Sequence, residues 1–251
     1  MKNIGLQVYT IREYLNDDES CMRALKRVKE IGYSFVQLFG LDEVLFRLAN
    51  CCKEIDLPVS GILTNLDSCY NNTEQLFEIA KICGAKDIGI SAAATDPYDI
   101  VKRSNEFALI AKRAGLTFSY HNHGYEFEKT NDDVTVMDIY IREFNENVLF
   151  MPDTYWVQYG GTEVRSFFDR LGTRIGSVHL KDMKLIDNKQ TFAEIGQGNL
   201  NMLEIIKTAE KYNVRDFIVE QDECDGDPLY SVAKSLTFYE NILNNYFKTK
   251  N

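Results

Sequence analysis

Short apolar runs alternate with longer amphipathic segments along the whole chain. The runs are rich in β-branched and aromatic residues, and most are followed by apolar side chains spaced three or four residues apart. This alternation predicts strand followed by helix about eight times, with a period of roughly 30 residues, the size of a strand–helix–strand unit. The predicted strands are residues 4–9, 35–39, 57–63, 87–90, 116–120, 147–151, 175–180 and 216–220.

Capping residues help to bound the predicted helices. Residues 16–18 offer N-caps to a helix carrying Met22, Leu25, Val28 and Ile31, which Gly32 closes as a C-cap. Asn201 and Glu204 resemble a capping box at the start of another helix. The remaining predicted helices are residues 41–55, 72–83, 98–114, 134–144, 162–171 and 229–243.

Many predicted strands are continuous apolar runs rather than alternating ones, which is typical of parallel strands buried on both faces. Eight such units close naturally into an α/β fold, a (β/α)₈ TIM barrel, and we expect residues 1–251 to form one barrel domain. A doubly wound open sheet is the rival. The turn after the first strand, residues 10–13, lacks the Gly-rich phosphate-binding fingerprint of that fold.

Composition narrows the class of protein. The hydrophobic content of 45% and charged content of 26% are ordinary for a globular protein, and the net charge of −10 argues against nucleic-acid binding. Six cysteines without Cys-x-x-Cys spacing, and no signal-peptide pattern, favour free thiols in the cytoplasm. No apolar run approaches the ~20 residues of a membrane span.

The three histidines all lie at the ends of predicted strands. His121 and His123 come directly after the strand 116–120, and His179 comes near the end of the strand 175–180. Alternate strand residues point to one face, so His121 and His123 can project together. In a parallel α/β fold, this edge is where ligands bind.

Two carboxylates lie at the ends of two further predicted strands. Asp153 follows the sixth strand, and Glu220 is the last residue of the eighth. Imidazoles and carboxylates from four consecutive strands can hold one divalent ion, and mixed nitrogen and oxygen donors suit Mn²⁺, Zn²⁺, Co²⁺ or Fe²⁺ better than Mg²⁺. Other roles remain open for each residue alone. A histidine at a strand end can be a hydrogen-bonded structural residue. Asp153 can cap a helix, and Glu220 can be one partner of a surface ion pair.

These residues lie in segments that resemble the sugar phosphate isomerase/epimerase family of the xylose isomerase-like TIM-barrel superfamily. The resemblance covers essentially the whole chain, and an inosose dehydratase-like branch is included in it. It implies a (β/α)₈ fold, a divalent metal, and isomerase, epimerase or dehydratase activity on a sugar, keto-sugar or inositol derivative. The matching segments are residues 5–10, 120–123, 152–156, 179–182 and 194–198.

The resemblance also implies site residues. Asp153, His179 and Glu220 match the family's metal-ligand positions, and His121 stands where the fourth ligand is often a glutamate. Trp156 stands where epimerases of the superfamily usually carry a substrate-binding histidine, which counts against a ketose 3-epimerase. Gln37 stands where relatives often end the second strand with glutamate.

We therefore expect a metal-dependent isomerase or epimerase that moves a proton next to a metal-polarised carbonyl. Glu220 can act on the proton, and His123 or Lys181 would supply the second group. Instead of moving a proton, His123 can be a hydrogen-bonded residue of the core or next to the ligands. Lys181 can instead anchor substrate oxygens or pair with Asp182. A dehydratase or lyase acting by β-elimination on a keto-sugar or inosose is a close second, because it needs such an asymmetric pair.

The expected partner is a small sugar or polyol, on which Trp156 and Tyr9 would stack. Residues 194–198 are expected to form a loop over the barrel mouth, with glycines for turn freedom. A multinuclear DNA-repair endonuclease is disfavoured by three histidines and a net charge of −10. A non-catalytic sugar-binding barrel or enzyme subunit stays an alternative. Oligomeric state is open, although barrels of this kind often self-associate.

Overall fold

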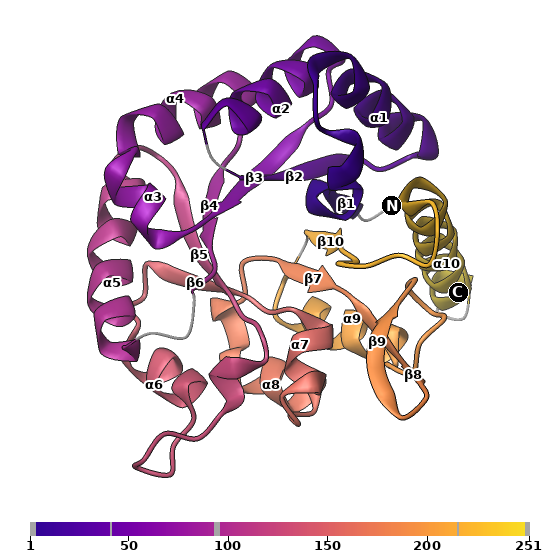
Figure 1. Ribbon diagram of the computed structural model, residues 1–251. Coiled ribbons are helices and arrows are strands. Elements are labelled where there is room, and N and C mark those ends of the chain that lie inside the picture. The colour runs from indigo at the N-terminus through magenta and orange to yellow at the C-terminus, as the bar shows by residue number, and fades with distance from the viewer. Residues whose placement is uncertain (1–3, 41, 93–95, 215, 249–251) are drawn as a thin grey trace.

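Eight parallel strands form a nearly closed barrel, the predicted fold (Figure 1). The computed structural model describes residues 4–40, 42–92, 96–214 and 216–248. The barrel strands are β1 (Ile4–Gln7), β2 (Phe35–Phe39), β3 (Val59–Thr64), β4 (Asp87–Ile90), β5 (Thr117–His121), β6 (Val148–Met151), β7 (Val178–Leu180) and β10 (Phe217–Val219). The strand order is β6-β5-β4-β3-β2-β1-β10-β7, so the last barrel strand pairs with the first.

The ring closes between β6 and β7 through isolated bridges rather than a continuous ladder. Phe150 bridges Ile175, and Asp153 bridges His179. The amide of His179 donates to the carbonyl of Pro152 at 3.0 Å. The closing contact therefore joins two of the residues expected to bind metal.

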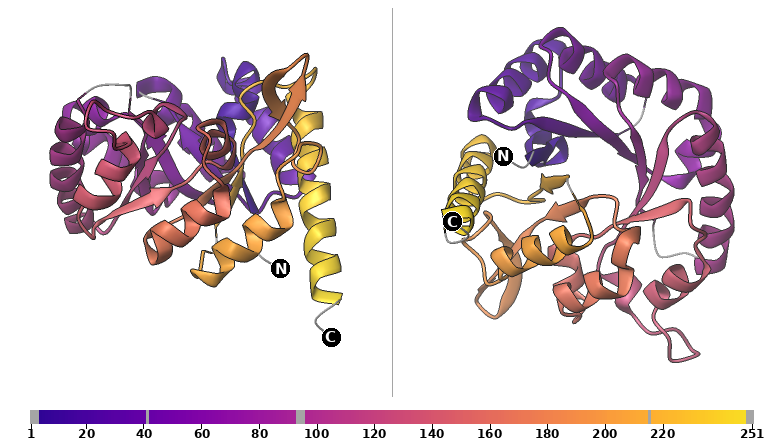
Figure 2. Two further views of the ribbon diagram at one scale, coloured as in Figure 1. Left: turned by 90° about the horizontal axis from the view of Figure 1, so that it is seen from below. Right: turned by 180° about the vertical axis from the view of Figure 1, so that it is seen from behind.

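Helices surround the strands as an outer layer (Figures 1 and 2). The α-helices are α1 (Asp18–Ile31), α2 (Asp42–Glu54), α3 (Leu66–Asn71), α4 (Thr73–Cys83), α5 (Pro97–Arg113), α6 (Val136–Glu143), α7 (Thr154–Tyr159), α8 (Val164–Leu171), α9 (Met202–Lys211) and α10 (Pro228–Lys248). Short 3₁₀ helices are η1 (Val8–Tyr14), η2 (Tyr125–Phe127) and η3 (Gly172–Arg174). In the part of the chain that is described, none of these helices combines the length and apolarity needed to cross a membrane.

Local sequence explains the first unit well. Asp17 and Ser20 form a reciprocal capping box, and Gly32 ends α1 at a φ of +115°. Leu25 and Val28 are fully buried on the inner face of α1. A side chain at Gly32 would be strained in this left-handed conformation, so the predicted C-cap has a physical cause.

The predicted first strand is too long. It ends at Gln7 because the carbonyl oxygen of the Gln7 side chain accepts from the amide of Tyr9 and begins η1. The third strand likewise begins at Val59 rather than residue 57. Pro58 precedes it and contributes only its carbonyl, which accepts from Val36.

Besides the short 3₁₀ helices, the sequence prediction missed two α-helices, α3 and α7, and an antiparallel hairpin. The hairpin comprises β8 (Asp182–Ile186) and β9 (Lys189–Ala193). Its turn residues Asp187 and Asn188 have φ values of +50° and +62°. This two-residue Asp-Asn turn between strand-like segments was the available signal, since both residues tolerate positive φ.

Asp182 fixes the segment that follows the hairpin. Its buried carboxylate accepts from the backbone amides of Gly196, Gly198 and Leu200 at 2.8, 3.1 and 3.2 Å. Residues 194–198 therefore pack against the base of the hairpin, and none of them lines the cavity described below. All six cysteines are free thiols, as predicted.

Candidate metal centre

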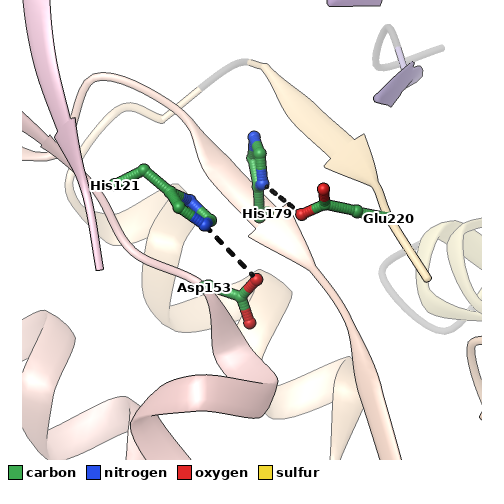
Figure 3. Close-up of side chains that lie close together, drawn as sticks. All are labelled: His121, Asp153, His179 and Glu220. Atoms are coloured by element: carbon green, nitrogen blue, oxygen red, sulfur yellow. Dashed lines mark hydrogen bonds and ion pairs between the residues drawn. The ribbon is translucent and has the colours of Figure 1, made fainter. Parts of the chain in front are cut away.

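Four buried side chains converge at the carboxyl ends of four neighbouring strands (Figure 3). His121 ends β5, Asp153 follows β6, His179 lies within β7, and Glu220 follows β10. One nitrogen or oxygen atom from each lies within 4.8 Å of the others. The tertiary structure thus brings together the four residues predicted as metal ligands.

The two carboxylate oxygens of Asp153 have different contacts. Its Oδ1 accepts from the amide of Trp156 at 3.1 Å and caps α7, which was the alternative role for this residue. Its own amide donates to Oδ1 of Asn122 at 3.1 Å. The second oxygen, Oδ2, remains directed at the cluster, 3.9 Å from Nε2 of His121.

His121 is a neutral ligand candidate with a free nitrogen. Burial, followed by the nearby His179 and His123, lowers the pKa of His121 well below its usual value. Its Nδ1 is buried without a hydrogen-bond partner in the described structure. The nitrogen directed at the cluster is Nε2, which lies 3.9 Å from Oδ2 of Asp153, so the neutral ring can offer a lone pair to a metal there.

His179 and Glu220 form a second pair in the cluster. Nδ1 of His179 lies 2.8 Å from Oε2 of Glu220, and Nε2 lies 2.7 Å from Oε1 of Gln37. Burial would raise the pKa of Glu220, but Lys181 and His179 outweigh it and hold that pKa well below its ordinary value. Glu220 is therefore an ionised, buried carboxylate and not a surface ion-pair partner.

Lys181 places a buried cation beside the cluster. Its Nζ lies 2.9 Å from Asp153, 3.0 Å from Glu220 and 2.9 Å from Asp222, and the residue is only 1% exposed. Burial opposes its charge, yet these carboxylates raise its pKa above the ordinary value. The alternative pairing with Asp182 is wrong, because the Asp182 carboxylate is committed to backbone amides.

Charge balance also fits a divalent ion. Burial raises the pKa of Asp153, although Lys181 counteracts this effect. With all three carboxylates ionised around one ammonium, the cluster carries a net charge of about −2. One divalent cation would neutralise it.

A cavity of about 350 Å³ opens beside the cluster. Of the predicted site residues, Tyr9, His121, His123, Lys181 and Glu220 line it. The aromatic rings of Tyr9 and Phe39 meet edge to face at 5.0 Å on its wall. Asp222 and Arg12 also line the cavity, and the sequence reasoning had singled out neither.

His123 lies in the cavity wall next to the cluster. Its ring centroid is 5.1 Å from that of His121 and 5.6 Å from that of Trp156. Burial and then the Lys181 charge lower the pKa of His123 to about 4, so the ring is neutral near pH 7. Trp156 itself is not among the residues lining the cavity; it packs against His123 and contacts Tyr155 and Tyr159.

Glu126 is a buried residue that the sequence reasoning missed. Its carboxylate accepts from the amide of His123 and the hydroxyl of Tyr120, both at 2.9 Å, and so holds the His121–His123 segment. Burial raises the pKa of Glu126 to about 7. Nothing in the spacing around Glu126 distinguished it from a surface glutamate.

Comparison with known proteins agrees with this architecture. Residues 25–242 match the model of a family described as xylose isomerase-like TIM barrel. A sugar phosphate isomerase/epimerase from Parabacteroides distasonis has a similar structure, with a TM-score of 0.78, 19% identity, and 94% of this chain and 93% of that chain covered.

Two further solved structures share the fold. An L-ribulose 3-epimerase has a TM-score of 0.76, 15% identity, and coverage of 100% of this chain and 97% of its own. The IOLI protein, solved with a bound zinc atom, has a TM-score of 0.75, 15% identity, and coverage of 98% and 99%. At these identities the likeness shows the fold alone. A search of curated proteins finds no match.

Proposed function

Because the chain belongs to the xylose isomerase-like TIM barrel family, we propose that it is a metal-dependent enzyme that isomerises or epimerises a sugar or keto-sugar. The observation that carries this proposal is the buried group of His121, Asp153, His179 and Glu220 beside a cavity that Lys181 also lines. The proposed enzyme is one barrel domain. Its proposed partner is a small sugar or polyol, since structurally similar proteins are named as a sugar phosphate isomerase/epimerase and an L-ribulose 3-epimerase.

The four buried side chains would hold one divalent ion, either Mn²⁺, Zn²⁺, Co²⁺ or Fe²⁺. When bound, the ion would polarise a substrate carbonyl and acidify the adjacent C–H bond. Two carboxylates and two imidazoles supply mixed oxygen and nitrogen donors, which favour these ions over Mg²⁺.

The surrounding residues divide the proton chemistry between them. His123 is neutral and lines the cavity, so its imidazole can accept a proton from substrate. Lys181 keeps its proton because three carboxylates surround it. When a metal takes up Asp153 and Glu220, the ammonium would have donors free for hydrogen bonds to a developing oxyanion. Glu220 is ionised and can take part in proton transfer from the other side of the cluster.

Tyr9 offers a ring on the cavity wall on which a sugar would stack. Trp156 would act indirectly, because it packs behind His123 rather than lining the cavity. Lys181 would also anchor a substrate oxygen.

A β-elimination on a keto-sugar or inosose is the second candidate. The observation that favours it is the unequal pair formed by a neutral imidazole, His123, and an ammonium, Lys181, where a two-carboxylate epimerase would place similar groups on both sides. Removal of water needs one group to accept a proton and another to assist the leaving hydroxyl.

One experiment separates these reactions. Protein purified without chelator is assayed for bound metal, loaded with Mn²⁺, and incubated with candidate keto-sugars in D₂O. Deuterium incorporation without loss of water supports isomerisation or epimerisation, whereas an enone absorbance supports elimination. Failure to bind any divalent metal, with no change in thermal stability on adding Mn²⁺ or Zn²⁺, would exclude the enzyme and leave a sugar-binding barrel.

A further inference from the structure

Two buried glutamines adjoin the metal centre at the ring nitrogen of His179 that does not face Glu220. Gln7 and Gln37 occupy the same register position on β1 and β2 and are 0% and 1% exposed. Nε2 of Gln7 lies 2.7 Å from Oε1 of Gln37, and that oxygen lies 2.7 Å from Nε2 of His179. A chain of hydrogen bonds therefore runs from β1 to the imidazole.

A backbone amide determines which groups donate and which accept in this series of hydrogen bonds. Tyr9 N–H lies 3.2 Å from Oε1 of Gln7, and a backbone N–H can only donate. Gln7 must therefore present oxygen to Tyr9 and its NH₂ group to Gln37. Turning either carboxamide over would place donor against donor, at Tyr9 or between the two glutamines.

The consequence for His179 follows from the same logic. Because Oε1 of Gln37 is an acceptor, Nε2 of His179 must carry a hydrogen and donate it. A metal can then bind only through Nδ1, where it replaces the proton that Nδ1 shares with the Glu220 carboxylate in the metal-free protein. That nitrogen faces Glu220 and belongs to the cluster of four ligand candidates.

We propose that Gln37, oriented by Gln7, is a positioning residue that keeps the Nε2 proton on His179 and so presents Nδ1 to the metal ion. This inference rests on the metal centre proposed above. It also explains why two carboxamides are buried in the barrel interior. Without the acceptor at Gln37, a ring that carries one proton would keep it on Nδ1, next to the Glu220 carboxylate, where it would block the metal.

The amide also leaves the local charge unchanged. A glutamate at position 37 would accept from His179 equally well, but it would add a buried negative charge. The cluster with one divalent ion is close to neutral as it stands. Gln37 thus supplies the acceptor geometry without that charge.

The test observes the ring nitrogens of the histidines by NMR. The chain has only three histidines, so their signals can be told apart. Metal-free protein labelled with ¹⁵N-histidine is examined by NMR, and the signals lost in His179→Gln identify His179. We expect a protonated, pyrrole-type Nε2 in the wild type. In Gln37→Met, which keeps the side-chain length but lacks the acceptor, Nε2 should shift toward the pyridine-type signal.

Metal binding gives the second readout. Zn²⁺ titration against a competing chelator should show affinity 10- to 100-fold weaker in Gln37→Met, the usual loss for an outer-shell partner. Gln37→Glu restores the acceptor and should recover both the Nε2 signal and an affinity within a few-fold of wild type. Gln7→Met should give a smaller shift in the same direction, because it frees the Gln37 amide to turn over.

Met151→Leu is the packing control. Its sulfur lies 3.4 Å from Nε2 of Gln37, so this change alters the same buried contact without touching the acceptor. It should leave the Nε2 signal and Zn²⁺ affinity unchanged. The proposal requires the tautomer shift and the affinity loss together in Gln37→Met; either one alone, or neither, overturns it. If wild-type protein fails to bind Zn²⁺, the proposed metal centre fails, while the metal-free NMR spectrum still tests the hydrogen-bond chain.

Discussion

Nζ of Lys181 lies 2.9 Å from Oδ2 of Asp153, so a buried ammonium contacts one of the candidate ligand carboxylates directly. The same ammonium is 3.0 Å from Glu220 and 2.9 Å from Asp222. It therefore neutralises part of the negative charge on which a metal would depend. When the other two carboxylates bind metal, Asp222 can still pair with the ammonium.

Lys181→Met should make the metal-free protein much less stable. Removing one member of a buried charge cluster typically costs about 3–5 kcal/mol, because uncompensated charges remain. Bound Mn²⁺ would supply the missing positive charge, so the rise in Tm on adding Mn²⁺ should be larger in Lys181→Met than in wild type. Differential scanning fluorimetry with and without the metal measures both effects.

Lys184→Met is the matched control, because Lys184 pairs with the exposed Asp225 and should contribute less than about 1 kcal/mol. An equal Mn²⁺-dependent rise in Tm in Lys181→Met and wild type would contradict the charge role of Lys181.

Loss of a candidate ligand should abolish metal retention. His121→Ala, His179→Ala and Glu220→Ala should each weaken Mn²⁺ or Zn²⁺ binding by more than about 100-fold, beyond the loss for an outer-shell partner. Elemental analysis after gel filtration and chelator competition provide the measurements. His123→Ala, beside the cluster but outside it, should retain metal. Normal metal binding in both His179→Ala and Glu220→Ala would show the site assignment to be wrong.

His123→Gln should lower kcat by about 10²–10⁴-fold, the usual contribution of a general acid or base. Its neutral imidazole lines the cavity and is the proposed proton acceptor. Bound metal per protein should not change. Turnover of the keto-sugar identified in the D₂O experiment provides the assay, and a wild-type kcat in this variant would remove His123 from the mechanism.

The buried carboxyl group of Glu126 should make the stability of the protein depend on pH. Burial raises its pKa to about 7, from an ordinary value near 4.5, so the folded protein keeps a proton that the unfolded chain loses between these values. Raising pH through this window therefore lowers the free energy of unfolding, by about 3 kcal/mol in total. Glu126→Gln stays neutral and should escape this loss.

The measurement is urea unfolding of wild type and Glu126→Gln at pH 5, 6, 7 and 8. The difference between them should shift in favour of the variant as pH rises. Glu128→Gln, an exposed neighbour, should show no such trend. A difference that is independent of pH would mean that Glu126 is ionised throughout.

Asp182→Ala should destabilise the protein without affecting metal binding. The carboxylate accepts from the backbone amides of Met183, Gly196, Gly198 and Leu200. Leaving buried amides unpaired costs about 1–3 kcal/mol for each group that water cannot reach, so we expect a loss of about 3 kcal/mol. Thermal unfolding measures it, with the exposed Asp225→Ala as control. Reduced Zn²⁺ affinity would instead place Asp182 in the site.

The sequence by itself determined the barrel and its candidate ligands. Strand and helix periodicity, together with caps such as Asp17 and Gly32, are local properties, and they predicted most elements within a few residues. Polar residues at strand ends are equally visible in the chain. Since parallel strands align their carboxyl ends, His121, Asp153, His179 and Glu220 were predicted to meet, and the structure brings them within 4.8 Å.

Only the tertiary structure decided which other residues complete the site. The partners of Lys181, the burial of Glu126 and the chain from Gln7 through Gln37 to His179 join residues far apart in sequence. Such contacts depend on strand register, barrel closure and desolvation, none of which has a local sequence signature. The same dependence explains why Trp156 packs behind His123, since its side-chain direction follows from how α7 packs after β6.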